Sequence, residues 1–176
     1  FNGLAVAAAK YLQTHLGAKV GILDCDMHHG DGTANILKHH PDLAARVVHH
    51  TSGKHFYGRE DPEKFFLWLE EAIADLNAAK VDVTIYQAGA DMHIDDPLGG
   101  LLDDAQMRRR DRTVFRGLQG GLVWNLAGGY RSGDSIFSDP VLQTHLATMN
   151  EADASDATRS QMFMHQPQRA AVRHSG

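Results

Sequence analysis

The sequence predicts a three-layer α/β fold, in which a mostly parallel sheet carries helices on both faces. Short apolar runs alternate with longer segments of helical periodicity along most of the 176 residues. The apolar runs are continuous, which is typical of parallel strands buried on both faces. This alternation of strands and helices favours a parallel sheet whose strands are joined by crossover helices.

The first half of the chain predicts two helices and two strands. An opening rich in Ala and Leu predicts a buried helix over residues 1–16, and a glycine ends it. An apolar run that ends in carboxylates predicts a strand over 19–26, and a second strand is expected over 46–51. The segment between them predicts a helix over 33–40.

The second half continues the same alternation. Helices are expected over 61–79 and from 139 to about 150, and both have a proline at an early position where its missing N–H costs little. A third helix with a charged outer face is expected over 103–115. The remaining two apolar runs predict strands over 81–90 and 122–127.

The two ends of the sequence predict different behaviour. Residues 1–150 hold all the expected elements and are assigned to one domain, whereas residues 151–176 lack apolar periodicity and predict a polar, flexible tail. The first residues have no basic segment and no cleavage signal, and they resemble a helix already under way. We therefore expect a chain that is truncated at its N-terminus.

Composition and charge exclude several classes of protein. The formal net charge of -5 gives no basic surface for direct nucleic-acid binding, and no apolar run approaches the roughly 20 residues that span a bilayer. Cys25 is the single cysteine, which excludes an intrachain disulfide and a Cys-rich zinc finger. A reducing, cytoplasmic location is the expectation that fits this cysteine content.

Chemically active side chains follow three of the four expected strands. Asp24, Asp26 and His28 alternate along the first run, so they can project to one side. Asp91 follows the third strand and Tyr130 the fourth. Ligands gather at the carboxyl ends of strands in open α/β sheets. One imidazole, two carboxylates and a position left for water describe a catalytic zinc site.

Each of these features has a simpler explanation when it is taken alone. An Asp-x-His pair is common in loops, and Asp91 could cap backbone N–H groups of the next segment. Tyr130 could be a packing residue and the Gly-Gly pair before it a turn. The joint placement of these features at successive strand ends is what favours the metal site.

Three motifs give the chain a resemblance to a known family. The runs DCDMHHGDGT (24–33), GADMHIDDPLGG (89–100) and LAGGY (126–130) resemble signatures of the histone deacetylase and acetylpolyamine amidohydrolase superfamily. They occur in the family's order, and the opening FNGLAVAA resembles a helix of that family. The resemblance covers roughly residues 1–150 and implies the C-terminal part of an arginase/deacetylase-like fold.

The resemblance implies a role for each matched residue. Asp26, His28 and Asp91 match the zinc ligands. Tyr130 matches the tyrosine that donates a hydrogen bond to the substrate carbonyl and then to the oxyanion. Asp24 and Asp31 match two catalytic carboxylates, described next.

In the family, these two carboxylates orient a tandem pair of catalytic histidines, and the first also lies at a structural potassium site. Asp24 and Asp31 therefore imply a histidine pair and a K⁺ ion near Asp24. In the family the histidines precede the segment that begins this chain with Phe1. We therefore expect deacetylation by this chain alone to be impaired.

Three functions stay open at the level of the sequence. The preferred one is a zinc-dependent hydrolase that removes acetyl groups from acetylated lysine side chains, polyamines or small metabolites. The second is a non-catalytic binding module stabilised by a metal. The third is a ureohydrolase with two manganese ions, which needs more bridging carboxylates. Sheet edges left without neighbours also predict self-association into a homo-oligomer.

Other conspicuous residues receive structural interpretations. The arginines at 108–110 are expected on a solvated helix face, and His93 is expected at the surface. Asp95 and Asp96 are expected to shape the turn before a proline. Cys25 is expected to point away from its two aspartate neighbours into apolar packing.

Overall fold

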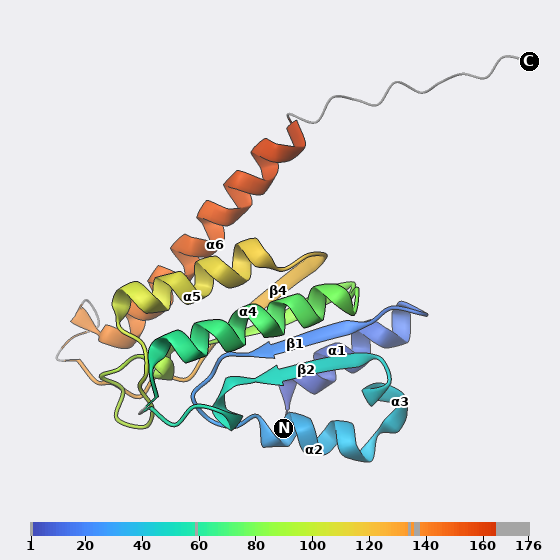
Figure 1. Ribbon diagram of the computed structural model, residues 1–176, viewed down its shortest axis with the longest axis horizontal. Coiled ribbons are helices and arrows are strands. Elements are labelled where there is room, and N and C mark those ends of the chain that lie inside the picture. Colours follow the sequence, from blue (N-terminus) through green and yellow to red (C-terminus); the bar gives the residue numbers. More distant parts are fainter. Residues whose placement is uncertain (1, 59, 134, 136–137, 165–176) are drawn as a thin grey trace, which may run out of the picture.

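A four-stranded parallel sheet forms the centre of the molecule (Figure 1). The computed structural model describes residues 2–58, 60–133, 135 and 138–164. The strands lie in the order β2 (Val47–Thr51), β1 (Val20–Asp24), β3 (Val83–Gly89) and β4 (Gly121–Ala127), and every pair is parallel. The predicted α/β fold with a parallel sheet is confirmed.

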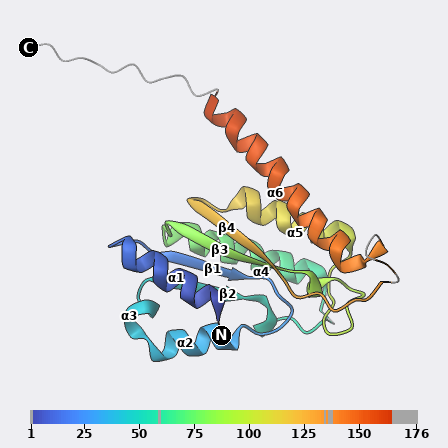
Figure 2. The same cartoon turned by 180° about the vertical axis from the view of Figure 1, so that it is seen from behind.

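Helices cover both faces of the sheet and make it the middle of three layers (Figures 1 and 2). One face carries α1 (Gly3–Thr14), α2 (Asp31–His39) and the short α3 (Pro41–Ala44). The other carries α4 (Pro62–Ala78) and α5 (Asp104–Gly117). The last helix, α6 (Pro140–Met164), packs against α5.

The two faces have separate apolar cores. The core under α4 and α5 contains fully buried side chains such as Leu23 of β1, Phe65 and Leu69 of α4, and Tyr86 of β3. The core under α1 is smaller and includes Ile22 of β1. Because each large apolar side chain contributes roughly 1.5–3 kcal/mol when fully buried, these cores hold β1 and β3 rigidly at the centre of the sheet.

Strand register brings the carboxyl ends of β1, β3 and β4 to one edge of the sheet. Asp24, the last residue of β1, pairs with Gln87, and Gly89 at the end of β3 pairs with Ala127 at the end of β4. Two short 3₁₀ turns follow at this edge, Ser52–Lys54 after β2 and Ala90–Met92 after β3. The motif residues of the three strands therefore meet in one place.

The last helix departs from the sequence prediction. Its expected end near residue 150 is wrong, because α6 continues to Met164. Polar contacts with α5 stabilise the helix beyond residue 150. The Arg112 guanidinium donates hydrogen bonds of 3.0 and 2.7 Å to the Glu151 carboxylate. The remainder of the predicted flexible tail, 165–176, lies outside the described residues. Among the described helices, none is long and apolar enough to cross a membrane.

Candidate metal centre

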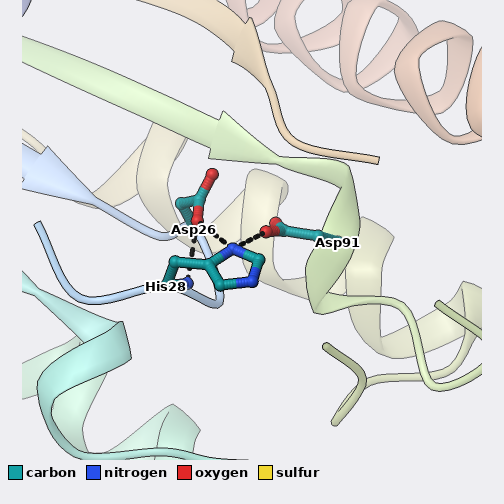
Figure 3. A group of neighbouring side chains, drawn as sticks. All are labelled: Asp26, His28 and Asp91. Carbon is teal, nitrogen blue, oxygen red and sulfur yellow. Dashed lines mark hydrogen bonds and ion pairs between the residues drawn. The ribbon is translucent and has the colours of Figure 1, made fainter. Parts of the chain in front are cut away.

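Two carboxylates and one imidazole converge at the ends of β1 and β3 (Figure 3). The ligand atoms of Asp26, His28 and Asp91 all lie within 4.8 Å of one another. His28 Nδ1 stands 3.2 Å from Asp26 Oδ1 and 2.8 Å from Asp91 Oδ2. The structure thus brings the three expected ligands together, and their binding of a metal stays a prediction.

Local hydrogen bonds shape the loop that carries two of these residues. The backbone N–H of His28 donates to Asp26 Oδ1 at 2.8 Å, which turns the chain so that both side chains face the same way. The backbone N–H of Met27 donates to Asp91 Oδ1 at 3.3 Å, and this bond ties the loop after β1 to the turn after β3.

Two glycines leave the space in which the ligands meet. A Cβ at Gly89 would lie 2.5 Å from Asp26 Cα, so the ends of β1 and β3 could not approach so closely with a larger residue. Gly128 has a φ of +55°, and a Cβ there would lie 2.5 Å from the Asp91 carboxylate. The backbone that follows β4 therefore bends past Asp91 without covering it with a side chain.

The electrostatics of the cluster fit a divalent cation. Asp91 is fully buried, and its Oδ2 accepts no well-aligned hydrogen bond from the described residues, although His28 Nδ1 faces it. Burial, followed by the negative charge of Asp26, raises the pKa of Asp91 to about 6. A buried carboxylate that has one oxygen without a well-aligned donor and lies beside another carboxylate is stabilised by a bound cation. One nitrogen and two oxygen ligands suit zinc.

His28 responds to the same negative charges. Burial lowers the pKa of its imidazole, but the charges of Asp91 and Asp26 outweigh that effect and raise it. In this arrangement a proton on Nδ1 lies between the two carboxylates, at the atom that would bind a metal. Metal and proton therefore compete for one nitrogen.

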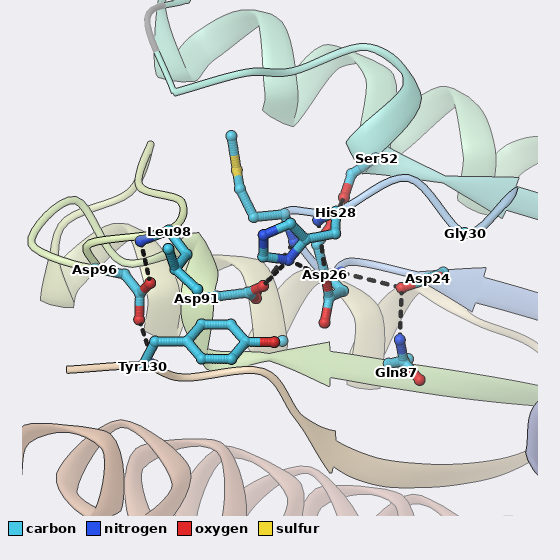
Figure 4. A network of polar contacts seen from close by, with 12 residues as sticks. Asp24, Asp26, His28, Gly30, Ser52, Gln87, Asp91, Asp96, Leu98 and Tyr130 are labelled. Carbon is cyan, nitrogen blue, oxygen red and sulfur yellow. Dashed lines mark hydrogen bonds and ion pairs between the residues drawn. The ribbon is translucent and has the colours of Figure 1, made fainter. Parts of the chain in front are cut away.

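Tyr130 lies at the open side of this cluster (Figure 4). Its ring meets the ring of His28 edge-on, with 5.7 Å between the ring centroids. Its side chain is half exposed, at 49%. Partial burial and the charges of Asp26 and Asp91 raise the pKa of the phenol, so its hydroxyl keeps its proton at neutral pH. The hydroxyl is thus available as a hydrogen-bond donor beside the cluster.

The loop after Asp91 holds the backbone that carries Tyr130. The Tyr130 N–H donates to Asp96 Oδ2 at 2.7 Å, and the Leu98 N–H donates to Asp96 Oδ1 at 3.0 Å (Figure 4). Asp96 does shape the turn, as expected, and it also fixes the start of the tyrosine segment. The sequence offered no direct signal for this second contact, because 34 residues separate the two partners.

The prediction of a surface location for His93 is wrong. Its side chain is only 4% exposed, because it lies between Arg131 and Asp104. Its Nδ1 lies 2.9 Å from Arg131 Nη1 and its Nε2 lies 3.1 Å from Asp104 Oδ1. His93 therefore supports the segment after Tyr130 instead of lining the surface.

The other two predicted catalytic carboxylates lie outside the ligand cluster. Asp24 is buried, and its Oδ1 accepts hydrogen bonds from the Asp26 N–H at 3.1 Å and from Gln87 Nε2 at 3.0 Å. Burial raises the pKa of Asp24 to about 7. Asp31 is exposed and is the first residue of α2. Cys25 is fully buried in the larger apolar core, as expected.

Comparisons with known proteins agree with these motifs. A family model described as histone deacetylase domain matches residues 1–65. The chain is 34% identical to "Histone deacetylase 10, chloroplastic" of Oryza sativa subsp. japonica over 179 residues, which covers 86% of this chain and 40% of that protein. It is 26% identical to "Acetylpolyamine amidohydrolase 2" of Pseudomonas aeruginosa, covering 74% of this chain and 44% of that protein.

The fold resembles solved structures of the same group of proteins. The structure of an acetylpolyamine aminohydrolase from Burkholderia pseudomallei superposes with a TM-score of 0.63 at 19% identity, covering 88% of this chain and 49% of that chain. The chain belongs to the histone deacetylase and acetylpolyamine amidohydrolase superfamily. It spans less than half of the length of each of these three proteins.

Proposed function

We propose that this chain carries the metal-binding part of a zinc-dependent amide hydrolase that removes acetyl groups from acetylated amines. The convergence of Asp26, His28 and Asp91, with the Tyr130 ring against His28, is the observation that carries the proposal. When bound, a zinc ion supplies Lewis-acid polarisation of a carbonyl and lowers the pKa of water. Asp26, His28 and Asp91 would hold the ion.

Tyr130 is proposed as the donor that stabilises the reacting carbonyl oxygen. Its phenol is protonated at neutral pH, and partial burial and the nearby carboxylates raise its pKa further. A donor fixed beside the developing oxyanion contributes more in the transition state than in the ground state. The bends at Gly128 and Gly129, both with positive φ, turn Tyr130 toward the cluster.

We further propose that this chain alone turns over substrate slowly. The buried carboxylate of Asp24 accepts from an amide side chain and a backbone N–H, where the family's pattern calls for an imidazole. Loss of a general base costs a factor of about 10²–10⁴ in rate. Asp24 and Asp31 are proposed to orient the histidine pair when that pair is supplied.

The proposed substrates are acetylated lysine side chains, acetylated polyamines and small acetylated metabolites. The names of the rice and Pseudomonas relatives support this class, because both denote enzymes that act on such amides. All three present the same scissile amide, so the proposal stops at the acetylated amine.

A non-catalytic binding module is the second candidate function. The observation that favours it is the environment of Asp24. The family pattern requires a histidine pair beside this residue, whereas in this chain Asp24 accepts from the Gln87 side chain. Such a module would bind zinc and an acetylated ligand without releasing acetate.

The first experiment measures zinc per chain after dialysis against metal-free buffer and then the hydrolysis of an acetyl-lysine peptide and of an acetylated polyamine. The variant is Asp91→Ala, and the matched control is Asp95→Ala, in the same loop but exposed. We expect about one zinc in the parent and the control and little in Asp91→Ala. Acetate release that disappears in Tyr130→Phe identifies the hydrolase.

Other results would lead to different conclusions. Zinc binding without acetate release above the Tyr130→Phe level favours the binding module. Two manganese ions per chain would favour a ureohydrolase. A folded parent that binds no zinc would contradict the proposal.

Three further proposals accompany this function. A potassium ion near Asp24 would stabilise a carboxylate whose pKa burial raises to about 7, and thermal unfolding in potassium against tetramethylammonium buffer tests it. The outer edge of β4 has no partner strand among the described residues, which supports self-association, testable by sedimentation. A cytoplasmic location rests on the cysteine content alone, and fractionation of cells tests it.

A further inference from the structure

One arginine of the charged helix α5 lies inside the molecule. Arg108 and Arg109 are exposed, as expected for the predicted solvated face, and Arg109 pairs with Glu63 at 2.6 Å. Arg110 has no exposed surface and is the largest of the fully buried side chains. The prediction of a solvated face is therefore wrong for Arg110, and its buried charge needs a physical reason.

The guanidinium of Arg110 contacts the backbone at the ends of two strands. Its Nη1 donates to the carbonyl oxygen of Gly89 at 2.6 Å and to that of Cys25 at 3.4 Å. Cys25 immediately precedes Asp26, and Gly89 lies two residues before Asp91. One donor atom thus links the two segments that carry the proposed ligands.

This link lies where the backbone pairing between β1 and β3 ends. The register runs to Asp24 opposite Gln87, and the Cys25 N–H still donates to the Gln87 carbonyl at 3.1 Å. Beyond that point the pairing between β1 and β3 stops, and Arg110 bonds the carbonyl oxygens of Cys25 and Gly89. A strand ladder cannot make this contact, since two carbonyl oxygens need a donor between them.

A polar network balances the buried charge. Asp111 Oδ1 lies 2.8 Å from both Nε and Nη2 of Arg110. The same carboxylate accepts the Tyr86 hydroxyl on Oδ1 at 2.5 Å and the Thr148 hydroxyl on Oδ2 at 2.7 Å. Apolar residues of similar volume often replace a buried ion pair without loss of stability. They could not donate to the two carbonyls.

We propose that Arg110 is a positioning residue, which sets the distance between the Asp26 and Asp91 segments by bonding the carbonyls of Cys25 and Gly89. The proposal rests on the proposed metal site for its consequence, which is tighter zinc binding. The distance between the two segments can be measured without metal. The Met27 N–H, which donates to Asp91 Oδ1 across them, reports their distance.

The test compares two substitutions in the same network. Arg110→Met puts an unbranched apolar side chain in place of the arginine and removes the donors to both segments. Thr148→Val removes one hydrogen bond to Asp111 and leaves the contacts of Arg110 in place. Arg109→Met serves as the control for loss of a charge on α5. Circular dichroism and thermal unfolding establish that each variant is folded.

Amide hydrogen exchange of the metal-free protein is the first readout. We expect protection of the Met27 N–H to fall at least tenfold in Arg110→Met and to stay within twofold of the parent in Thr148→Val and Arg109→Met. Zinc affinity, measured against a chromophoric chelator, is the second. We expect it to fall about 10–100-fold in Arg110→Met only. The visible spectrum of the cobalt-substituted protein should change in the same variant only.

The two readouts separate the two proposals. Unchanged Met27 protection in a folded Arg110→Met, or equal losses in Thr148→Val, would overturn the positioning role. A parent that binds no zinc contradicts the proposed function. The hydrogen-exchange result at Met27 then decides the positioning role of Arg110 by itself. If Arg110→Met does not fold, Arg110→Lys replaces it, because a lysine keeps the charge beside Asp111 without the planar fork. In Arg110→Lys we expect Met27 protection to fall about threefold to tenfold, and no loss would refute the positioning role of Arg110.

Discussion

The site has a buried half and an open half, and they are built differently. Asp91 has no exposed surface and follows β3, a central strand of the sheet, whereas Tyr130 is 49% exposed and follows β4 at the sheet's edge. Every residue of β1 is buried, while residues of β4 are exposed or half-buried along its length. The proposed zinc ligands and the proposed oxyanion donor therefore lie in regions that differ strongly in burial.

This difference suggests that metal binding and catalysis can be changed separately. The buried half is fixed by two strands, by the Met27 hydrogen bond to Asp91 and by Arg110. The open half is fixed at Tyr130 by one hydrogen bond to Asp96. Substitutions in the first should change zinc affinity, and substitutions in the second should change turnover.

The largest effect is expected from removing the imidazole ligand. His28→Ala should weaken zinc binding by more than about 100-fold, because a ligand atom is lost and two carboxylates are left facing each other. Tyr130→Ala is the matched variant, since it removes the ring that contacts His28 and keeps all three ligands. Competition with a chromophoric chelator measures both. Equal losses in the two variants would contradict a separation of the halves.

The next effect concerns the reacting carbonyl. Tyr130→Phe removes only the hydroxyl and should lower the rate of acetate release by about 10²–10³, the cost of losing one oxyanion donor. Its zinc affinity should equal that of the parent. The rate is measured on this chain joined to the family's histidine-bearing segment, so that the proposed general base is present. A rate within twofold of the parent would remove Tyr130 from the proposed mechanism.

A smaller effect is expected at the contact that places the tyrosine. Asp96→Asn keeps an acceptor for one of its two backbone donors, so the start of the Tyr130 segment should loosen without unfolding. We expect roughly a tenfold loss of turnover, since small misplacements of a catalytic group are costly. Asp95→Asn, whose carboxylate is exposed, should leave the rate unchanged. Altered zinc affinity in Asp96→Asn would show that the halves are coupled.

The smallest effect tests a strand outside both halves. Burial, aided by the charges of His50 and His29, lowers the pKa of His49 on β2 from 6.5 to about 4. The unfolded chain therefore takes up a proton between these values while the folded chain does not. As pH falls through this window, the stability contributed by neutral His49 is lost.

In His49→Leu, this loss should be about 1 kcal/mol smaller than in the parent between pH 7 and pH 5. Urea unfolding at the two pH values measures it. The buried carboxyls of Asp24 and Asp91, whose pKa values are raised, act in the opposite direction in both proteins and cancel in the comparison. Zinc affinity at pH 7 should not change, and identical pH dependence would contradict the assignment to His49.

Local sequence patterns predicted the strands and most helices because each has an apolar run or stripe, although the run of β4 is exposed or half-buried in the structure. An early proline predicted the start of α4, and the structure adds a cap there, in which Asp61 accepts from the Glu63 N–H at 3.0 Å. The short α3 was not predicted, and the polar contacts that extend α6 involve a partner helix that periodicity does not include.

Arg110 shows a signal that could have been used. Met107, Arg110 and Val114 recur at helical spacing, and all three are buried on one face of α5. The three consecutive arginines concealed this pattern, because a charge on an apolar stripe looks like its solvated neighbours. The partners of Arg110 are backbone carbonyls, and a sequence does not display these.

The sequence by itself determined which residues stand at the ends of the strands, because apolar runs fix the strands and the motif letters follow them. It thereby predicted that Asp26, His28 and Asp91 would meet. Only the tertiary structure decided how the segments that carry them are held, through Arg110 and through the contact of Asp96 with the Tyr130 segment. These contacts join residues 21, 34 and 85 positions apart, and such pairs become neighbours only after the sheet has formed.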